Sequence, residues 1–159
     1  MAQTGAQDDA SHLVETYSSI LLRLACTRLE NPADAEDVVQ EVFLKLLTAR
    51  PAFRDAEHEK AWLIRTTLHR AADLRKAAAR RNIPLEEALL ASAPEPENQL
   101  LAAVRALPEK YGAAIHLHYY EGYSLKEIEK LLGLPAATVG TRLARGRERL
   151  RQSLKEEIE

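Results

Sequence analysis

Apolar residues recur at every third or fourth position along almost the whole chain, and few folds are compatible with this period. Residues three and four apart share one face of an α-helix, whereas a half-buried strand needs strict alternation, which no stretch of this sequence sustains. We therefore predict an all-α protein. Prolines and glycines separate the expected helices, which cover residues 11–29, 33–49, 57–81, 99–106, 109–121, 124–132 and 136–156.

One segment interrupts this pattern. Residues 82–98, NIPLEEALLASAPEPEN, contain three prolines and little periodicity, so we expect a flexible linker. The linker divides the 159 residues into two small helical domains, 1–81 and 99–159. Domains of this size leave no room for a large enzyme with a deep active site.

The net charge of −2 argues at first against a nucleic-acid partner, because nucleic-acid-binding domains are usually basic. The charges are segregated, however: residues 60–82 and 138–155 are strongly basic, and most of the remaining chain is acidic. A polyanion responds to local fields rather than to the total charge. The two basic segments therefore indicate two contacts with nucleic acid, unless each is simply the solvated face of a helix.

The second basic segment is part of GYSLKEIEKLLGLPAATVGTRLARGRERLRQSL. Ser124 can cap a short helix, the turn Gly133-Leu134-Pro135 follows, and a longer helix starts at once, which is the spacing of a helix-turn-helix. One face of the longer helix is apolar. Hydroxyl and guanidinium groups suited to DNA occupy the rest, at Thr138, Thr141, Arg142, Arg145 and Arg149. The alternative is an arginine-rich surface helix of a bundle.

The helix expected over 33–49 has a core stripe made of Val39, Val42, Phe43, Leu46 and Leu47. This stripe leaves a mixed surface of acids, an amide and a leucine, with Asp37, Gln40, Glu41, Leu44 and Lys45. Such a surface is either plain solvated surface or a docking site, and the pattern alone does not separate the two.

The helix expected over 57–81 is apolar on one side, at Leu63, Thr67, Ala71 and Leu74. Its other side is a basic stripe of the kind that follows a phosphate backbone, with Arg65, His69, Lys76 and Arg80. Trp62 and Phe53 could stack on bases, but the helical spacing of Trp62 favours core packing.

Other features exclude several classes of protein. Cys26 is the single cysteine, so the chain has no intramolecular disulfide, and no apolar run is long enough to span a bilayer. The first residues are polar and lack the apolar core of a signal peptide, so we expect a cytoplasmic protein. No catalytic motif is present. His116 and His118 lie about 200° apart on a helix, so they cannot bind the same metal ion. We expect no metal and no cofactor.

Three stretches resemble one known family: DAEDVVQEVFLKLL (34–47), EHEKAWLIRTTLHRAADLRK (57–76) and LPEKYGAAIHLHYYEGYSLKEIEKLLGLPAATVGTRLARGRERL (107–150). In this order and spacing they are similar to bacterial extracytoplasmic-function (ECF) sigma factors, the small promoter-recognising subunits of RNA polymerase. The resemblance implies a sigma region 2 domain over 1–81, a linker over 82–98 and a sigma region 4 domain over 99–159.

The resemblance also implies roles for particular residues. The clamp helices of the largest polymerase subunit would be contacted by Asp37, Gln40, Glu41 and Leu44. The opened −10 promoter element would be held by Phe53, His58, Arg65, His69, Arg70, Lys76 and Arg80. The −35 element would be read in the major groove by Thr138, Thr141, Arg142, Arg145 and Arg149. His69 stands where the family often has asparagine, and Gly140 where lysine is frequent.

Further partners implied by the resemblance are the flap of the second-largest polymerase subunit and an anti-sigma protein that wedges between the two domains. The sigma factor itself would catalyse no reaction. Two other classes remain as alternatives: a helix-turn-helix repressor with an N-terminal oligomerisation module, and an all-α adaptor that binds only proteins. The adaptor leaves both basic segments unexplained, and an enzyme is the least expected class.

Overall fold

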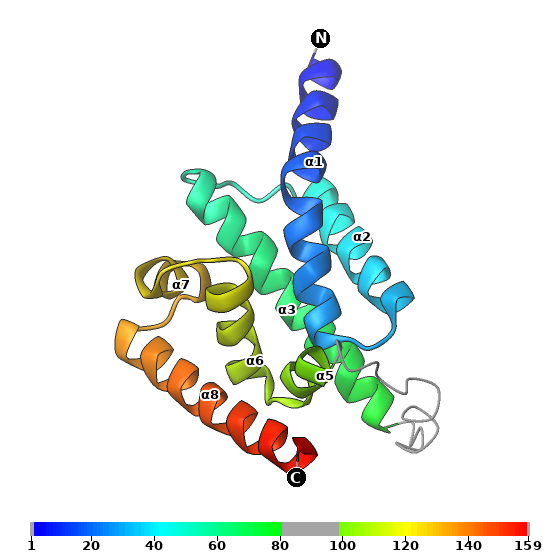
Figure 1. Cartoon of the computed structure of the whole chain (residues 1–159). Helices are drawn as coiled ribbons and strands as arrows, with labels where there is room; N and C mark the ends of the chain where they lie inside the picture. The colour runs from blue at the N-terminus through cyan, green and yellow to red at the C-terminus, as the bar shows by residue number, and fades with distance from the viewer. Residues whose placement is uncertain (1, 81–98, 159) are drawn as a thin grey trace.

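The computed structural model describes residues 2–80 and 99–158, with side chains over 11–80 and 99–155. Within these ranges the chain is helical and contains no strand, which confirms the all-α prediction (Figure 1). The N-terminal half comprises α1 (Ala2–Arg28), α2 (Pro32–Ala49) and α3 (Ala56–Arg80). The C-terminal half comprises α5 (Gln99–Ala106), α6 (Glu109–Ile115), the π-helix η2 (His116–Tyr120), α7 (Leu125–Leu132) and α8 (Ala136–Ile158). The linker expected over 82–98 lies outside the described residues.

The first three helices pack against one another around fully buried aliphatic side chains, among them Leu21, Leu24, Val38, Leu63 and Ile64. Local signals set the ends of α2. The Asn31 side chain accepts a hydrogen bond from the amide of Ala33 at 2.9 Å, and Pro32 occupies the first helical turn, where a missing N–H costs nothing. Arg50 ends the helix in the left-handed region, with φ of 44°.

The predicted helix-turn-helix consists of α7 and α8. Ser124 and Glu127 form a capping box, and Gly133 ends α7 with φ of 67°, a conformation that glycine adopts without a steric penalty. Ile128 and Leu131 of α7 are buried, as are Val139 and Leu143 of α8. This packing holds α8 with its polar face toward solvent.

One local prediction is wrong, and another is confirmed with a change of helix type. Leu47, expected in the core stripe of α2, is 49% exposed, because Leu46 already covers the core at this point and only 7% of it is exposed. The helix expected over 109–121 is present, but it changes from α to π after Ile115, and the amide of Glu121 donates to the carbonyl of His116 at 3.1 Å. A period near 3.6 does not reveal this wider turn.

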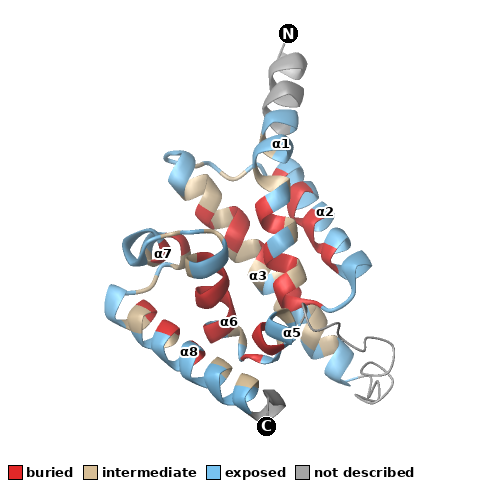
Figure 2. Ribbon diagram, in the orientation of Figure 1, coloured by how far each residue is buried: buried red, intermediate tan, exposed pale blue. Residues whose placement is uncertain are grey.

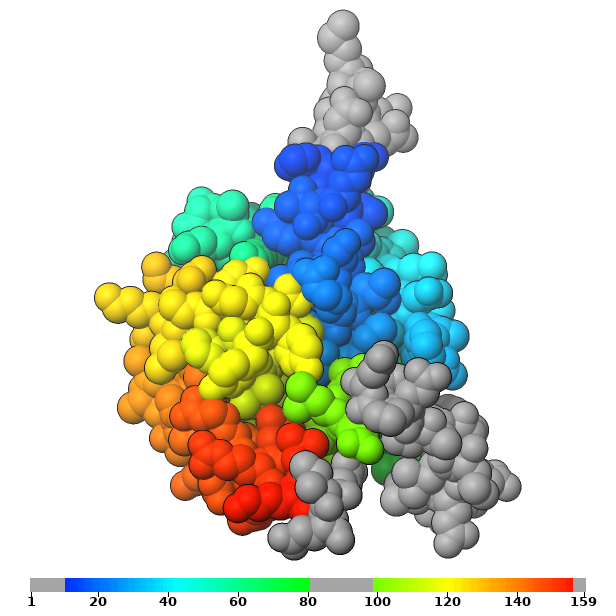
Figure 3. Space-filling model, viewed as in Figure 1, coloured from blue at the N-terminus to red at the C-terminus, as the bar shows by residue number. Residues whose placement is uncertain are grey.

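The two halves share one hydrophobic core. α3 contacts α7, and α1 contacts both α5 and α6. Buried residues gather where these helices face one another (Figure 2), and the surface of the C-terminal half meets that of α1 directly (Figure 3). The described helices include none that is long and apolar enough to cross a membrane.

Candidate nucleic-acid interface

The basic stripe on α3 has two different environments. His69 is exposed, as are Lys76 and Arg80 near the end of the helix. Arg65 is half-buried and turns toward α7, where its Nε donates to the carbonyl of Leu131 at 2.8 Å and its Nη2 to the carbonyl of Lys130 at 2.9 Å. The last carbonyls of a helix lack partners within the helix and lie at its negative end, so a guanidinium is well suited to cap them.

Phe53 and His58, both expected to contact the −10 element, lie before α3 and in its first turn. The Phe53 ring packs edge-on against His58 at 5.4 Å and against Trp62 at 5.9 Å. His58 Nδ1 accepts from the backbone amide of Arg54 at 3.1 Å. Trp62 is half-buried and packs on the core, in agreement with the packing interpretation of this residue.

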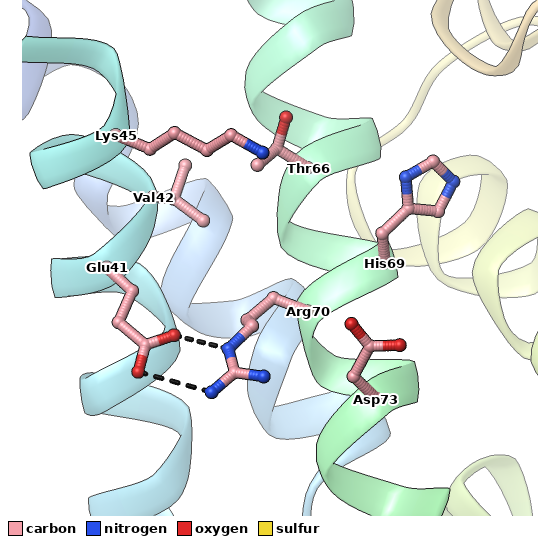
Figure 4. A pocket seen from close by; sticks show the side chains of 7 residues that line it. All are labelled: Glu41, Val42, Lys45, Thr66, His69, Arg70 and Asp73. Atoms are coloured by element: carbon pink, nitrogen blue, oxygen red, sulfur yellow. Dashed lines mark hydrogen bonds and ion pairs between the residues drawn. The ribbon is translucent and has the colours of Figure 1, made fainter. Parts of the chain in front are cut away.

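Glu41 of α2 and Arg70 of α3 form an ion pair across a pocket of about 280 Å³ (Figure 4). The hydrogen bond from Arg70 to Glu41 raises the pKa of the guanidinium. Both side chains are partly exposed, so the pair contributes at most about 1 kcal/mol to stability. Glu41, which is expected to contact polymerase, is thus bonded to Arg70, which is expected to contact DNA. The pocket is lined by Glu41, Val42, Lys45, Thr66, His69, Arg70 and Asp73.

The four residues expected to dock on polymerase are all exposed along one face of α2: Asp37, Gln40, Glu41 and Leu44. Leu44 is 61% exposed, and the unexpectedly exposed Leu47 lies one turn further along. Two exposed leucines in a polar surface enlarge the apolar part of this face beyond the single leucine expected from the sequence.

The polar face of α8 borders an open hollow of about 360 Å³ that is lined in part by Thr138, Thr141, Arg142 and Arg145. Tyr111 of α6 lies at its edge. A hydrogen bond with Arg145 lowers the pKa of Tyr111, and the guanidinium of Arg149 lies 5.1 Å from the ring centre of the same tyrosine. The tyrosine therefore lies beside two of the five predicted DNA-reading residues.

A polar network between the halves, which the sequence pattern does not indicate, is built around the buried His116. The Arg23 guanidinium holds the Glu121 carboxylate at 3.0 and 2.7 Å, and Glu121 also hydrogen bonds to His116 Nε2 at 2.8 Å. His116 Nδ1 lies 2.8 Å from Thr27 Oγ1. The π-turn helps to form the network, because it brings the Glu121 carboxylate, five residues later, within hydrogen-bond distance of His116 Nε2.

Arg28, at the end of α1, is only 3% exposed. Its guanidinium donates to the carbonyls of Val104 at 3.0 Å, Arg105 at 3.3 Å and Leu107 at 3.5 Å. Burial lowers the pKa of Arg28 to about 10, and the nearby Arg75 adds to the effect. The only signal in the sequence is an arginine in the last turn of a helix, which is common on surfaces and does not indicate burial.

No three His, Cys, Asp or Glu side chains within the described residues are placed to hold a metal ion. His116 and His118 have separate partners, since His118 Nδ1 lies 2.8 Å from the carbonyl of Tyr123. The candidate interface carries basic, hydroxyl and acidic side chains on α2, α3 and α8.

Acidification is expected to destabilise the contact at His116. Burial lowers the pKa of His116, and Arg23 and Arg28 add to the effect against the opposing influence of Glu121. The unfolded chain then binds more protons than the folded chain below about pH 6.5, so the free energy of unfolding falls as the pH drops through this range. Burial raises the pKa of Glu121, but Arg23 and His116 outweigh it and leave that pKa lowered, so further stability is lost below about pH 4.5.

Urea unfolding at about pH 7 and pH 5.5 measures the histidine contribution, with His116→Gln as the control that cannot titrate. We expect the loss of stability between the two pH values to be smaller in this variant. An equal loss in both proteins would show that another group is responsible.

The chain is similar in sequence to known proteins of one family. The family model for sigma-70 region 2 matches residues 13–81, and that for sigma-70 region 4 matches residues 97–150. The ECF RNA polymerase sigma factor SigW of Bacillus subtilis is 29% identical over 172 residues, which cover 96% of this chain and 92% of SigW. The ECF sigma-E factor of Escherichia coli K12 is 30% identical over 166 residues, which cover 92% of this chain and 86% of that protein.

This protein belongs to the ECF RNA polymerase sigma factors. It is a DNA-binding factor for promoter-specific initiation of transcription. The sigma factor family supplies a specificity subunit of RNA polymerase rather than a catalyst.

Solved structures of similar proteins agree with the fold of this sigma factor. The structure of CnrH in complex with the cytosolic domain of CnrY has a TM-score of 0.70 and 27% identity, and the match covers 94% of this chain and 90% of CnrH. The sigma factor RpoE in complex with the anti-sigma factor NepR, from Bartonella quintana, has a TM-score of 0.68 and 20% identity, with coverage of 92% and 97%. At 20% identity, the similarity to RpoE shows a shared fold and nothing about function.

Proposed function

We propose that this sigma factor docks on the clamp helices of the largest polymerase subunit through Asp37, Gln40, Glu41 and Leu44. All four side chains are exposed on one face of α2, and the exposed Leu47 extends the apolar part of that face. A face that combines exposed leucines with acidic and amide groups has the composition of a protein-binding surface, with the charged groups favouring a basic partner.

Region 2, over residues 1–81, contacts the −10 element through the loop before α3 and the basic stripe on α3. The side chains involved are Phe53, His58, Arg65, His69, Arg70, Lys76 and Arg80. The exposure of His69, Lys76 and Arg80 along one helix supports contacts with successive phosphates. Arg65 and Arg70 reach DNA only after exchanging their present partners, the α7 carbonyls and Glu41.

Region 4, over residues 99–159, reads the −35 element with Thr138, Thr141, Arg142, Arg145 and Arg149 of α8. The observation that carries the proposal is the open hollow beside this helix, in which hydroxyl and guanidinium groups converge and Tyr111 positions Arg145. Arginine can hold the major-groove edge of guanine with two parallel hydrogen bonds, so a positioned Arg145 suits base recognition.

The flap of the second-largest subunit binds an apolar groove on region 4. The groove has a volume of about 490 Å³ and includes Leu100, Tyr119 and Tyr120, which are each about half exposed. Exposed aromatic and leucine side chains around a hollow favour an apolar helix or loop of a partner. The remaining lining residues are Val104, Ile115, Arg147, Leu150, Arg151 and Leu154.

An anti-sigma protein is a further partner, an expectation supported by the similar protein CnrH, which was solved in complex with the cytosolic domain of another protein, CnrY. The proposal also includes a cytoplasmic location, a connecting linker over 82–98 and the absence of any reaction catalysed by the chain itself. The sigma factor opens promoter DNA through binding energy, by favouring the separated strands over the duplex.

Transcription in vitro with purified core polymerase and a promoter library tests the docking surface. We expect Asp37→Lys to abolish promoter-dependent RNA, because it reverses a charge on the docking face. Glu15→Lys on α1 is the matched control, since it makes the same charge change at another exposed site. Glu41 is a poorer choice because its substitution also releases Arg70. Equal activity of the two variants would rule out docking through this face.

The same library tests base recognition by α8. Arg145→Ala is expected to cost about 1–3 kcal/mol of promoter binding and to relax sequence choice at one position of the −35 element. Sequencing of the transcribed promoters reveals that position. A loss that is equal for all promoters, with a smaller salt dependence, would instead make Arg145 a phosphate contact.

A further inference from the structure

Part of the −10 face of α3, at Arg65, is covered by the other half of the same chain. Arg65, which the proposed function places on DNA, has its guanidinium bonded to the carbonyls of Lys130 and Leu131 in the last turn of α7. Gly133, directly after α7, is packed so closely that a Cβ there would lie 3.2 Å from Arg65 Nη2. A DNA strand must therefore compete with these carbonyls for the Arg65 guanidinium.

The contact between the halves extends along α3 beyond Arg65. Leu68 and His69 of α3 line a pocket of about 230 Å³ together with Leu132, Leu134 and Arg142 of the C-terminal half. The −10 face and the start of the reading helix therefore border the same pocket, so the two DNA-binding surfaces lie against each other in the closed chain. The ion pair between Glu57 and Lys130, at 3.7 Å, lies across the same α3–α7 contact.

Three arginines hold the halves together on the side of α1. Arg23 holds Glu121, and the buried Arg28 holds the carbonyls at the end of α5. Arg105 of α5 donates in return to the carbonyl of Cys26 at 2.7 Å. Hydrogen bonds to charged groups are stronger than neutral ones, and a buried guanidinium pulled from its acceptors is costly.

The apolar core is continuous between the halves, so nothing outside the chain is needed to close it. Buried side chains of α1 and α3 belong to the same cluster as Leu107, Tyr111 and Leu117 of the C-terminal half. Separation of the halves exposes these side chains to water at a cost that scales with their apolar area.

We infer that this sigma factor holds itself closed, with α7 on the −10 face of α3, and that Arg65 either caps α7 or contacts DNA, never both at once. The inference rests on the proposed contact between Arg65 and the −10 element. Binding of polymerase and promoter must then supply the free energy that separates the halves, and variants that weaken the closed contact shift the population toward the open form.

A reversible lock across the α3–α7 contact tests the inference. In a Cys26→Ala background, the variant Glu57→Cys with Lys130→Cys places two thiols where the ion pair now lies, and a bis-methanethiosulfonate reagent joins them. We expect the locked chain to give about tenfold less promoter-dependent RNA than the same chain after reductive cleavage of the lock. Lys130→Cys alone, treated with the same reagent, controls for modification of one thiol.

Energy transfer between dyes on the same two cysteines reports closure of the free chain without polymerase. We expect high transfer in the parent, lower transfer in Arg23→Glu, and recovery when Glu121→Arg restores the pair with reversed charges. Lys126→Ala, which removes an exposed charge from α7, should leave the transfer unchanged.

Low transfer in the free parent chain, or full activity of the locked chain, would overturn the inference. If transfer shows closure but the unlocked chain makes no promoter-dependent RNA, the proposed function fails and the closed arrangement is upheld.

Discussion

Substitution of Gly112 by alanine is expected to lower the free energy of unfolding by about 2–4 kcal/mol. A Cβ at this position would lie 2.1 Å from Arg28 Nη1 and 2.5 Å from Cζ, so the guanidinium must move. Because Arg28 is buried and bonded to the carbonyls that end α5, the displacement leaves a buried charge and its acceptors without their partners.

A double-mutant cycle isolates this effect. In a helix that lacks such a contact, alanine is favoured over glycine by about 1 kcal/mol. We therefore expect Gly112→Ala to be stabilising in an Arg28→Ala background and destabilising in the parent, a reversal of sign that urea unfolding can measure. The same penalty in both backgrounds would mean that Gly112 does not accommodate Arg28.

Leu63→Ala is expected to destabilise the chain by about 2–5 kcal/mol, because the side chain is fully buried and its removal leaves a cavity. Thermal unfolding should show a decrease of about 2–4 °C in Tm for each kcal/mol lost. Leu44→Ala removes the same atoms from a position that is 61% exposed, and should change stability by less than about 0.5 kcal/mol.

The two leucines also separate stability from docking. Leu44→Ala should weaken the interaction with core polymerase while the fold stays intact, whereas Leu63→Ala should act through folding alone. Equal losses of stability in the two variants would contradict the burial of α3 in the structure.

Local physics made much of the fold predictable. The caps at Ser124 and Gly133 act within a few residues, so the limits of α7 follow from the sequence. The apolar period also identified the buried face of α8, with Val139 and Leu143 inside and Thr141 and Arg145 outside. Predictions of this kind depend only on neighbouring residues, and the structure agrees with them.

The differences from prediction arise where a distant element decides the outcome. Leu47 has the residue type and spacing of a core position, but none of the described helices buries it, and it is 49% exposed. The π-turn at His116–Tyr120 places His116 between Glu121 and Thr27, and Thr27 is 89 residues away from it along the chain. No window of local sequence contains that partner.

The sequence by itself determined the helices, the faces they bury and the two basic segments, because helix period and charge are properties of neighbouring residues. The tertiary structure alone decided which charges are free to meet DNA. Arg28 and Arg65 look like surface arginines in the sequence, yet both cap carbonyls at helix ends in the other half of the chain. The last carbonyls of a helix have no partner within the helix, so they accept hydrogen bonds from donors that tertiary packing brings near. Which donors these are depends on the packing of the whole chain.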